Sequence, residues 1–101
     1  MLAQFSIVPI GSGSSLGDEV AAVLDMVARS GMPYKVNPMG TVVEGDWDEI
    51  MELIRRCHDE IMKTEERVLI SLTIDDRKGR NNRIEEKVLS VERRLGVTLN
   101  K

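Results

Sequence analysis

The chain of 101 residues is long enough to bury one hydrophobic core, and 42% of it is hydrophobic while 31% is charged. Its net charge of -3 and its few aromatic residues, one each of Phe, Tyr and Trp, exclude the basic, aromatic-rich surface that nucleic-acid binding requires. No apolar run approaches the roughly 20 residues that span a bilayer. A single cysteine excludes an internal disulfide and a multi-thiolate zinc site. We therefore expect residues 1–101 to form a single cytoplasmic domain.

The first half of the chain predicts a strand, a helix and a hairpin. Leu2 to Pro9 alternates between apolar and mixed positions, which is typical of a strand with one buried face. After a loop rich in glycine and serine, apolar residues recur at helical spacing and predict a helix that ends at Ser30-Gly31. Tyr34 to Asn37 and Thr41 to Glu44 are short strand-like runs joined across Pro38-Met39-Gly40, which predicts a hairpin.

The second half predicts a helix, a strand and a last helix. Asp46 and Glu49 have the spacing of a capping box, so a helix is expected to begin behind them. Trp47 opens the apolar stripe of this helix, and we expect it to be a core anchor. Val68 to Ile74 alternates and is the clearest strand of the chain. A final amphipathic helix is expected from Asn82 to Gly96.

This order of elements, β-α-β-β-α-β with an additional C-terminal helix, predicts an α+β sandwich of the ferredoxin-like class. Right-handed crossovers are expected to place the first and third strands parallel in the centre, with both main helices on one face. The other face of the sheet carries a mixture of apolar and hydroxyl side chains, including Ser6. Such a face predicts a subunit interface or the floor of a ligand site.

Two similar phrases, Pro9-Ile10-Gly11-Ser12 and Pro38-Met39-Gly40-Thr41, each stand at the end of a strand-like run. With the expected strand directions, the first phrase lies near Glu44, at the end where both main helices begin. The second phrase lies at the other end, near Asp75. A site built from both phrases would then need a second chain.

Three features invite a binding role, and each has a plainer explanation. The Gly11 to Gly17 loop could bind an anion through backbone N–H groups, although Asp18 and Glu19 would repel a phosphate, and a tight loop with a serine cap is the alternative. Asp75 could orient a polar or cationic ligand, or could belong to a solvated turn. Glu44 could anchor an amine, or could be an exposed charge at a strand end.

No pattern in the chain predicts catalysis or a metal site. Cys57 and His58 are neighbours in the middle of a helix, so their side chains point about 100° apart and predict packing rather than a catalytic pair or a chelate. No Ser/His/Asp set, His-Glu-x-x-His motif or paired-carboxylate spacing occurs. We therefore expect no enzyme activity, no cofactor and no metal.

Three segments together carry a family resemblance: Phe5 to Gly11, Tyr34 to Trp47 and Ile74 to Arg77. The chain resembles the small ferredoxin-like family called thiamine-binding proteins, and the stretch Pro-x-Gly-Thr-x-x-Glu-Gly is fairly specific. The resemblance implies a homo-oligomer, commonly a tetramer of sheet-packed dimers. It also implies binding of thiamine or its hydroxymethylpyrimidine moiety, with no reaction assigned. The chain departs from many members at Glu19, where they carry a tyrosine.

From the residues and the resemblance together, we expect a small-molecule binding protein with its site at or near a subunit interface. A carboxylate would meet the positive charge of thiamine, and hydroxyl groups would supply hydrogen bonds. The alternative is a homo-oligomeric regulatory or structural module without a metabolite ligand. The ligand-binding residues that we expect are Ser6, Gly11, Ser12, Thr41, Glu44 and Asp75.

Overall fold

The computed structural model describes residues 1–11, 16–79 and 83–96. These residues form a four-stranded sheet in the order β2-β3-β1-β4, in which every neighbouring pair is antiparallel, together with three helices. This arrangement confirms the predicted α+β fold with an additional C-terminal helix. None of the described helices combines the length and the hydropathy needed to cross a membrane. The elements are β1 Leu2–Pro9, α1 Leu16–Arg29, β2 Tyr34–Asn37, β3 Gly40–Glu44, α2 Trp47–Met62, β4 Val68–Asp75 and α3 Arg83–Leu95.

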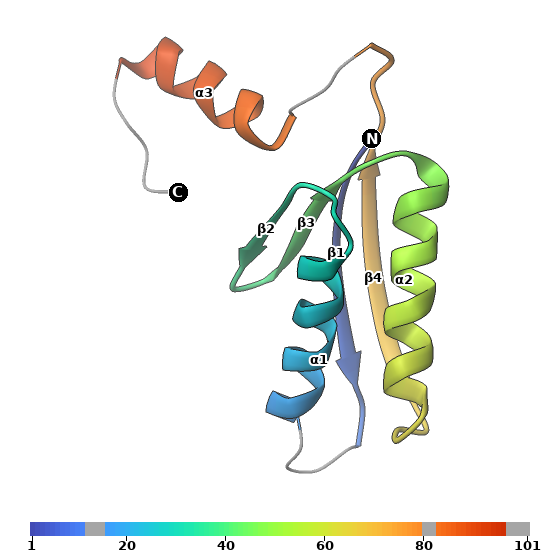
Figure 1. The fold of residues 1–101 in the computed structure, drawn as a ribbon. Helices are drawn as coiled ribbons and strands as arrows, with labels where there is room; N and C mark the ends of the chain where they lie inside the picture. The colour runs from blue at the N-terminus through green and yellow to red at the C-terminus, as the bar shows by residue number, and fades with distance from the viewer. Residues whose placement is uncertain (12–15, 80–82, 97–101) are drawn as a thin grey trace.

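Two helices cover one face of the sheet. Figure 1 shows α1 and α2 side by side on this face, with α3 beyond the end of the sheet that lies next to the N-terminus. The hydrophobic core lies between the sheet and these two helices, because the alternating strands and the amphipathic helices turn their apolar sides towards each other. Its buried members are Ala3, Phe5, Ile7, Val23, Val27, Met32, Val43, Ile50, Leu53, Cys57 and Ile61.

Local signals in the sequence set the ends of both main helices. The predicted capping box of α2 is present, with the Asp46 Oδ1 accepting from the Glu49 backbone N–H at 2.8 Å and the Glu49 Oε1 accepting from the Asp46 backbone N–H at 3.0 Å. After α1, Gly31 takes a φ of 80°, a left-handed conformation that ends the helix as predicted.

The first and third strands run antiparallel, so the prediction that they are parallel is wrong. Leu2 pairs with Glu44, and Phe5 pairs with Thr41. The reason lies in the connections. The α1 crossover returns the chain so that β2 runs in the direction of β1, and the hairpin then reverses β3. The two main helices therefore begin at opposite ends of the sheet (Figure 1).

The strand directions also correct the expected positions of the two similar phrases. Glu44 ends β3 beside the start of β1, where Gly45 donates its N–H to the Met1 carbonyl at 3.0 Å. Gly11 follows the far end of β1, so it does not lie near Glu44. The hairpin turn at Pro38 lies towards this same far end, because Thr41 is opposite Phe5. One chain thus brings Gly11 of the first phrase and Pro38 of the second to the same half of the sheet.

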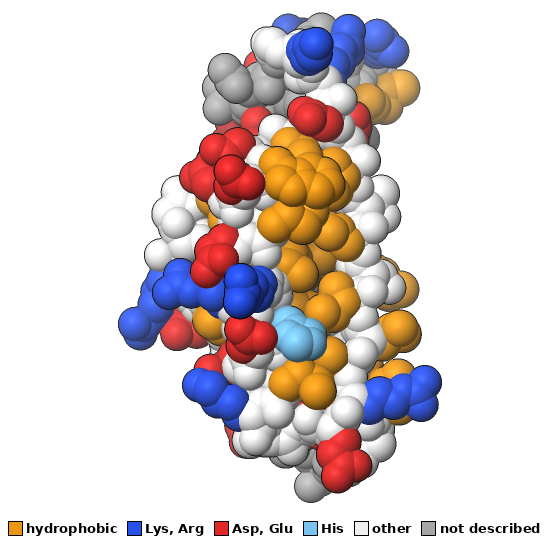
Figure 2. Space-filling model, turned by 90° about the vertical axis from the view of Figure 1, so that its right-hand side faces the viewer, with side chains coloured by type: hydrophobic (Ala, Val, Ile, Leu, Met, Phe, Trp, Pro, Cys, Tyr) orange, Lys and Arg blue, Asp and Glu red, His pale blue; other side chains and the backbone are white. Residues whose placement is uncertain are grey.

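The side of the molecule that α2 presents to solvent carries exposed hydrophobic groups. Figure 2 shows a band of hydrophobic side chains on this side, next to His58, the one histidine of the chain. Trp47 is 58% exposed, so its prediction as a core anchor is wrong. It is the first residue of α2, one turn before the buried Ile50, and the packing around Ile50 does not extend to it. Cys57 is fully buried, which agrees with its predicted packing role.

Candidate functional site

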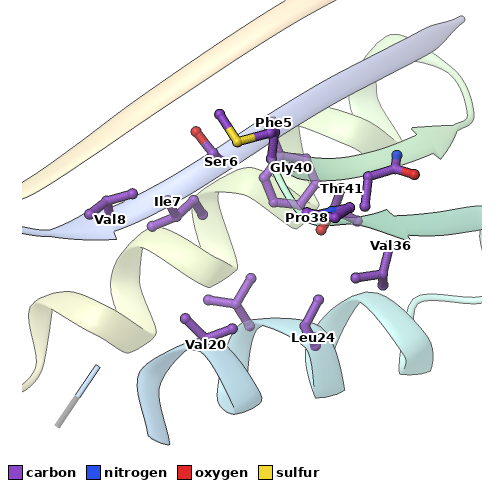
Figure 3. A pocket seen from close by; sticks show the side chains of 13 residues that line it. Phe5, Ser6, Ile7, Val8, Val20, Leu24, Val36, Pro38, Gly40 and Thr41 are labelled. Carbon is purple, nitrogen blue, oxygen red and sulfur yellow. The ribbon is translucent and has the colours of Figure 1, made fainter. Parts of the chain in front are cut away.

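A pocket of about 380 Å³ lies beside the start of β3, where β1 continues past the last residue that pairs with β3 (Figure 3). Residues 5–8 of β1 form one side of it, and residues 36–41 of the β2–β3 hairpin form another. Helix α1 closes it with Val20, Val23 and Leu24. The pocket therefore combines three segments that are far apart in the chain, and most of its lining is apolar.

The pocket exists because β1 is longer than its partner β3. Pairing between the two strands stops at Phe5 and Thr41, whereas β1 stays paired with β4 as far as Pro9 and Val68. Gly40 begins β3 at a close approach to β1, where an added Cβ would lie 3.1 Å from the Phe5 carbonyl oxygen. A side chain at this position would push the hairpin away from β1.

Polar groups reach the pocket from both sides of the β1 strand. Figure 3 shows the Ser6 side chain on the opposite side of the strand from Phe5 and Ile7, so the pocket extends around the edge of β1. Thr41 lies opposite Phe5 and is 7% exposed. Within the described part of the chain, no hydrogen bond engages the Thr41 hydroxyl, which leaves it available to a molecule in the pocket.

Two acidic residues lie at the other end of the sheet, on either side of β1, and each contacts α3. Glu44 and Asp75 both lie opposite Leu2, on the strands that flank β1. The Glu44 Oε1 accepts from the Ile84 backbone N–H at 3.5 Å, and the Asp75 Oδ2 pairs with the Lys87 Nζ at 2.8 Å. A carboxylate at the start of a helix satisfies a free N–H group and complements the helix dipole.

The six residues expected to bind a ligand therefore fall into separate groups. Ser6 and Thr41 line the pocket, whereas Glu44 and Asp75 lie opposite Leu2, which is four residues from Ser6 along β1, a distance of about 13 Å. Gly11 follows β1 with a φ of 78°, a conformation that favours glycine. Ser12 lies outside the described residues.

Asn37 also lines the pocket, although it was not among the residues expected to bind a ligand. The sequence feature that could have indicated Asn37 is its position immediately before Pro38, at the end of β2. This position belongs to the stretch that carries the family resemblance. Asn37 pairs with Gly40, so both lie on the Ser6 side of the sheet. An amide at this position can both donate and accept hydrogen bonds.

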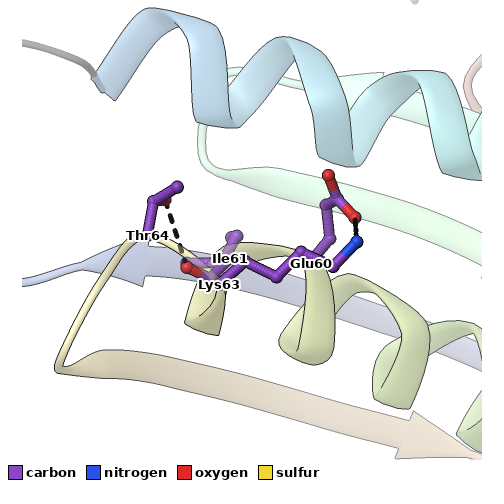
Figure 4. Close-up of polar contacts among 4 residues, drawn as sticks. All are labelled: Glu60, Ile61, Lys63 and Thr64. Carbon is purple, nitrogen blue, oxygen red and sulfur yellow. Dashed lines mark hydrogen bonds and ion pairs between the residues drawn. The ribbon is translucent and has the colours of Figure 1, made fainter.

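A second hollow, of about 320 Å³, lies between the start of α1 and the end of α2. Glu19 lines this hollow and not the pocket that contains Val20. Figure 4 shows the opposite wall, where the Lys63 Nζ pairs with the Glu60 Oε2 at 2.9 Å and the Thr64 hydroxyl donates to the Ile61 carbonyl at 3.4 Å. The Glu60 carboxylate raises the pKa of Lys63 through this hydrogen bond.

The described residues contain no group of three or more His, Cys, Asp or Glu side chains that could hold a metal ion. The pocket lining likewise contains no carboxylate, histidine or cysteine. Its chemistry is that of a small apolar cavity with a few polar groups, which is typical of sites that bind small molecules.

A family model for thiamine-binding proteins matches residues 3–92, a range that includes both ends of the sheet and the whole pocket. The UPF0045 protein MJ1052 of Methanocaldococcus jannaschii is 35% identical over 91 residues, which cover 90% of this chain and 91% of the relative. The chain belongs to the thiamine-binding protein family. This result confirms the predicted resemblance.

Two solved structures extend the comparison of this thiamine-binding family member to its fold. The crystal structure of MJ1052 matches with a TM-score of 0.80 and 36% identity, covering 89% of this chain and 93% of that one. A Thermotoga maritima protein, whose name suggests a role in thiamine biosynthesis or salvage, matches with a TM-score of 0.78 and 28% identity. This match covers 89% of the present chain and 96% of the Thermotoga chain.

Proposed function

We propose that this protein binds thiamine or its hydroxymethylpyrimidine moiety in the pocket between β1, the β2–β3 hairpin and α1. The observation that carries the proposal is the lining of this pocket in a member of the thiamine-binding family. Apolar side chains, among them Phe5 and Leu24, suit the faces of a flat heterocycle, and Ser6, Asn37 and Thr41 offer hydrogen bonds to its edge.

The pyrimidine half of thiamine is the part that we propose the pocket holds. Thiamine carries its positive charge on the other ring, and a cation enclosed without a counter-charge loses solvation that nothing replaces. The described lining of the pocket offers no carboxylate, and the carboxylates of Glu44 and Asp75 are engaged with α3. The charged ring would therefore extend through the mouth of the pocket.

We propose that the protein is a homo-oligomer with the site near a subunit interface. The family resemblance implies that this oligomer is commonly a tetramer. Val8 and Leu69 are opposite each other on the sheet face away from α1 and α2, and they are 43% and 56% exposed. Val8 also lines the pocket, so a second copy seated on this face would help to close it. We further propose that the chain forms a single domain and that it works in the cytoplasm. Fractionation of cells that express a tagged chain would test the location.

We propose binding without catalysis. Among the described residues, the pocket lining supplies two hydroxyl groups, from Ser6 and Thr41, but no acid or base beside them to activate either one. The alternative is an oligomeric module that binds no metabolite, and it predicts that neither thiamine nor hydroxymethylpyrimidine has a measurable affinity for the protein.

Calorimetric titration with hydroxymethylpyrimidine and with thiamine tests the proposal. Both are expected to bind, and Thr41→Val is expected to weaken binding about tenfold because it deletes one hydrogen bond in an enclosed site. Thr41→Ser keeps the hydroxyl and is the matched control, expected to bind like the wild type. If the wild-type protein gives no heat with either compound, the alternative module is the better account.

A further inference from the structure

One backbone edge in the pocket has hydrogen-bonding groups that the sheet does not use. Among the described residues, β1 has β4 opposite it along its whole length but has β3 opposite it only from Leu2 to Phe5. Ile7 lies beyond this pairing, and it lines the pocket.

Backbone groups of successive strand residues point to alternate sides. The Ile10 N–H donates to the Arg67 carbonyl at 2.9 Å, so even-numbered residues of this strand bond towards β4. The Met1 carbonyl accepts from the Gly45 N–H, so odd-numbered residues bond towards β3. Ile7 is odd-numbered, and its N–H and C=O therefore point to the β3 side, where no described strand lies opposite them.

The surroundings of Ile7 oppose the addition of another strand at this edge. Pro9 is the next residue that faces the same side, and it has no N–H to donate. Pro38 and Met39, which join β2 to β3, line the same pocket as Ile7 and limit the length of chain that could pair with this edge. A peptide strand would find only one residue here that offers both an N–H and a C=O. A small molecule needs only one such residue.

We propose that the N–H and C=O of Ile7 read the aminopyrimidine edge of the ligand. An exocyclic amine next to a ring nitrogen presents a donor beside an acceptor, which complements the acceptor and donor that one strand residue offers. The Ile7 carbonyl accepts from the amine, and the Ile7 N–H donates to the ring nitrogen. This inference rests on the proposed function, and it makes a backbone group the source of specificity.

The amine and the ring nitrogen are what the site selects, so the ligand can be tested one atom at a time. In the wild-type protein, replacing the amine of hydroxymethylpyrimidine by hydrogen is expected to weaken binding about tenfold. Replacing the adjacent ring nitrogen by C–H is expected to have a similar effect, because each change leaves one group of Ile7 without a partner.

A cycle that combines a variant with an analogue assigns the second effect to Ile7. Ile7→Pro removes the N–H without breaking the ladder with β4, because the bonds to β4 come from even-numbered residues. Ile7→Val keeps the N–H and is the matched control. Ile7→Pro is expected to bind hydroxymethylpyrimidine about tenfold more weakly than Ile7→Val, and both are expected to bind the ring C–H analogue equally.

Equal affinity of the two variants for hydroxymethylpyrimidine overturns the inference and leaves the proposed function standing. No binding of hydroxymethylpyrimidine or thiamine to the wild type overturns both. If Ile7→Pro does not fold, hydrogen exchange in the wild type gives the answer. Exchange of the Ile7 amide is expected to slow when hydroxymethylpyrimidine binds and to stay unchanged with the ring C–H analogue. An Ile7 amide that exchanges at the same rate with and without bound hydroxymethylpyrimidine contradicts the inference.

Discussion

The Glu44 carboxylate accepts a hydrogen bond from the Ile84 backbone N–H, joining the end of β3 to the start of α3 across 40 positions of sequence. Glu44 is 8% exposed, so its carboxylate, which the sequence suggested as a ligand-binding group, is instead buried and bonded within the fold. Asp75 supports the same helix through Lys87. The two acids therefore position α3, and the pocket lies elsewhere.

Glu44→Ala is expected to loosen α3 and to leave the pocket unchanged. Losing a group that caps a helix costs about 1 kcal/mol in free energy of unfolding. Amide exchange in the first turn of α3 is expected to become faster, which mass spectrometry can measure, while the affinity for hydroxymethylpyrimidine stays the same. Glu44→Gln keeps an acceptor oxygen and should have a smaller effect. Loss of ligand binding with unchanged exchange in α3 would instead restore Glu44 to the binding site.

Val20→Trp is expected to block the pocket from the α1 side. Val20 lines the pocket and is 43% exposed, so a larger side chain can enter the cavity without overpacking the core. We expect at least a tenfold loss of affinity with a melting temperature close to that of the wild type. Ala21→Trp adds the same ring at the next residue of α1, which is exposed and outside the lining. Equal binding by the two variants would place the ligand elsewhere.

Cys57 is expected to be unreactive in the folded protein. Its burial raises the pKa of the thiol to about 11, and the nearby positive charge of Arg56 offsets only part of this effect. At pH values near 8 little thiolate is present, and the side chain is fully buried. A chromogenic thiol reagent should react promptly with the chain in denaturant and very slowly without it. Fast reaction under native conditions would contradict the packing of α2.

Glu65 is expected to make the folded protein sensitive to pH. A hydrogen bond to Glu19 raises the pKa of the Glu65 carboxyl above its usual value of 4.5. The folded chain therefore holds this proton more tightly than the unfolded chain. The resulting stabilisation is present below pH 4.5 and is lost as the pH rises through the raised pKa.

Glu65→Gln keeps a donor for Glu19 at every pH and tests this dependence. Its melting temperature is expected to exceed that of the wild type at neutral pH, and the difference should shrink in more acidic buffer. Glu66→Gln removes a neighbouring charge and is the control, for which no such convergence is expected. A difference in melting temperature between Glu65→Gln and the wild type that stays constant across the pH range would contradict the hydrogen bond between Glu65 and Glu19.

The identity and the limits of the elements were predictable because short-range patterns determine them. Alternation from Leu2 to Pro9 gave the bounds of β1, and the spacing of Asp46 and Glu49 gave the start of α2. The relative direction of β1 and β3 depends on the whole path of the chain through α1 and the hairpin. The wrong direction predicted for β3 relative to β1 placed Glu44 near Gly11, at the wrong end of the sheet.

The site was predictable in part for the same reason. Ser6 and Thr41 stood out as hydroxyl residues in strand-like runs, and both line the pocket. The partner of Glu44 is 40 positions away, so no local pattern could reveal that its carboxylate is used by α3. The free edge at Ile7 follows from the unequal lengths of β1 and β3, which only the strand pairing reveals.

Amide chemical shifts of the labelled protein, recorded with and without hydroxymethylpyrimidine, test whether the ligand occupies the pocket between β1, the β2–β3 hairpin and α1. Saturating ligand is expected to shift the amide signals of Ile7 and Thr41, at the pocket, while those of Leu2 and Asp75, at the α3 end of the sheet, stay in place. Shifts confined to the α3 end, with the Ile7 and Thr41 signals unmoved, would contradict it.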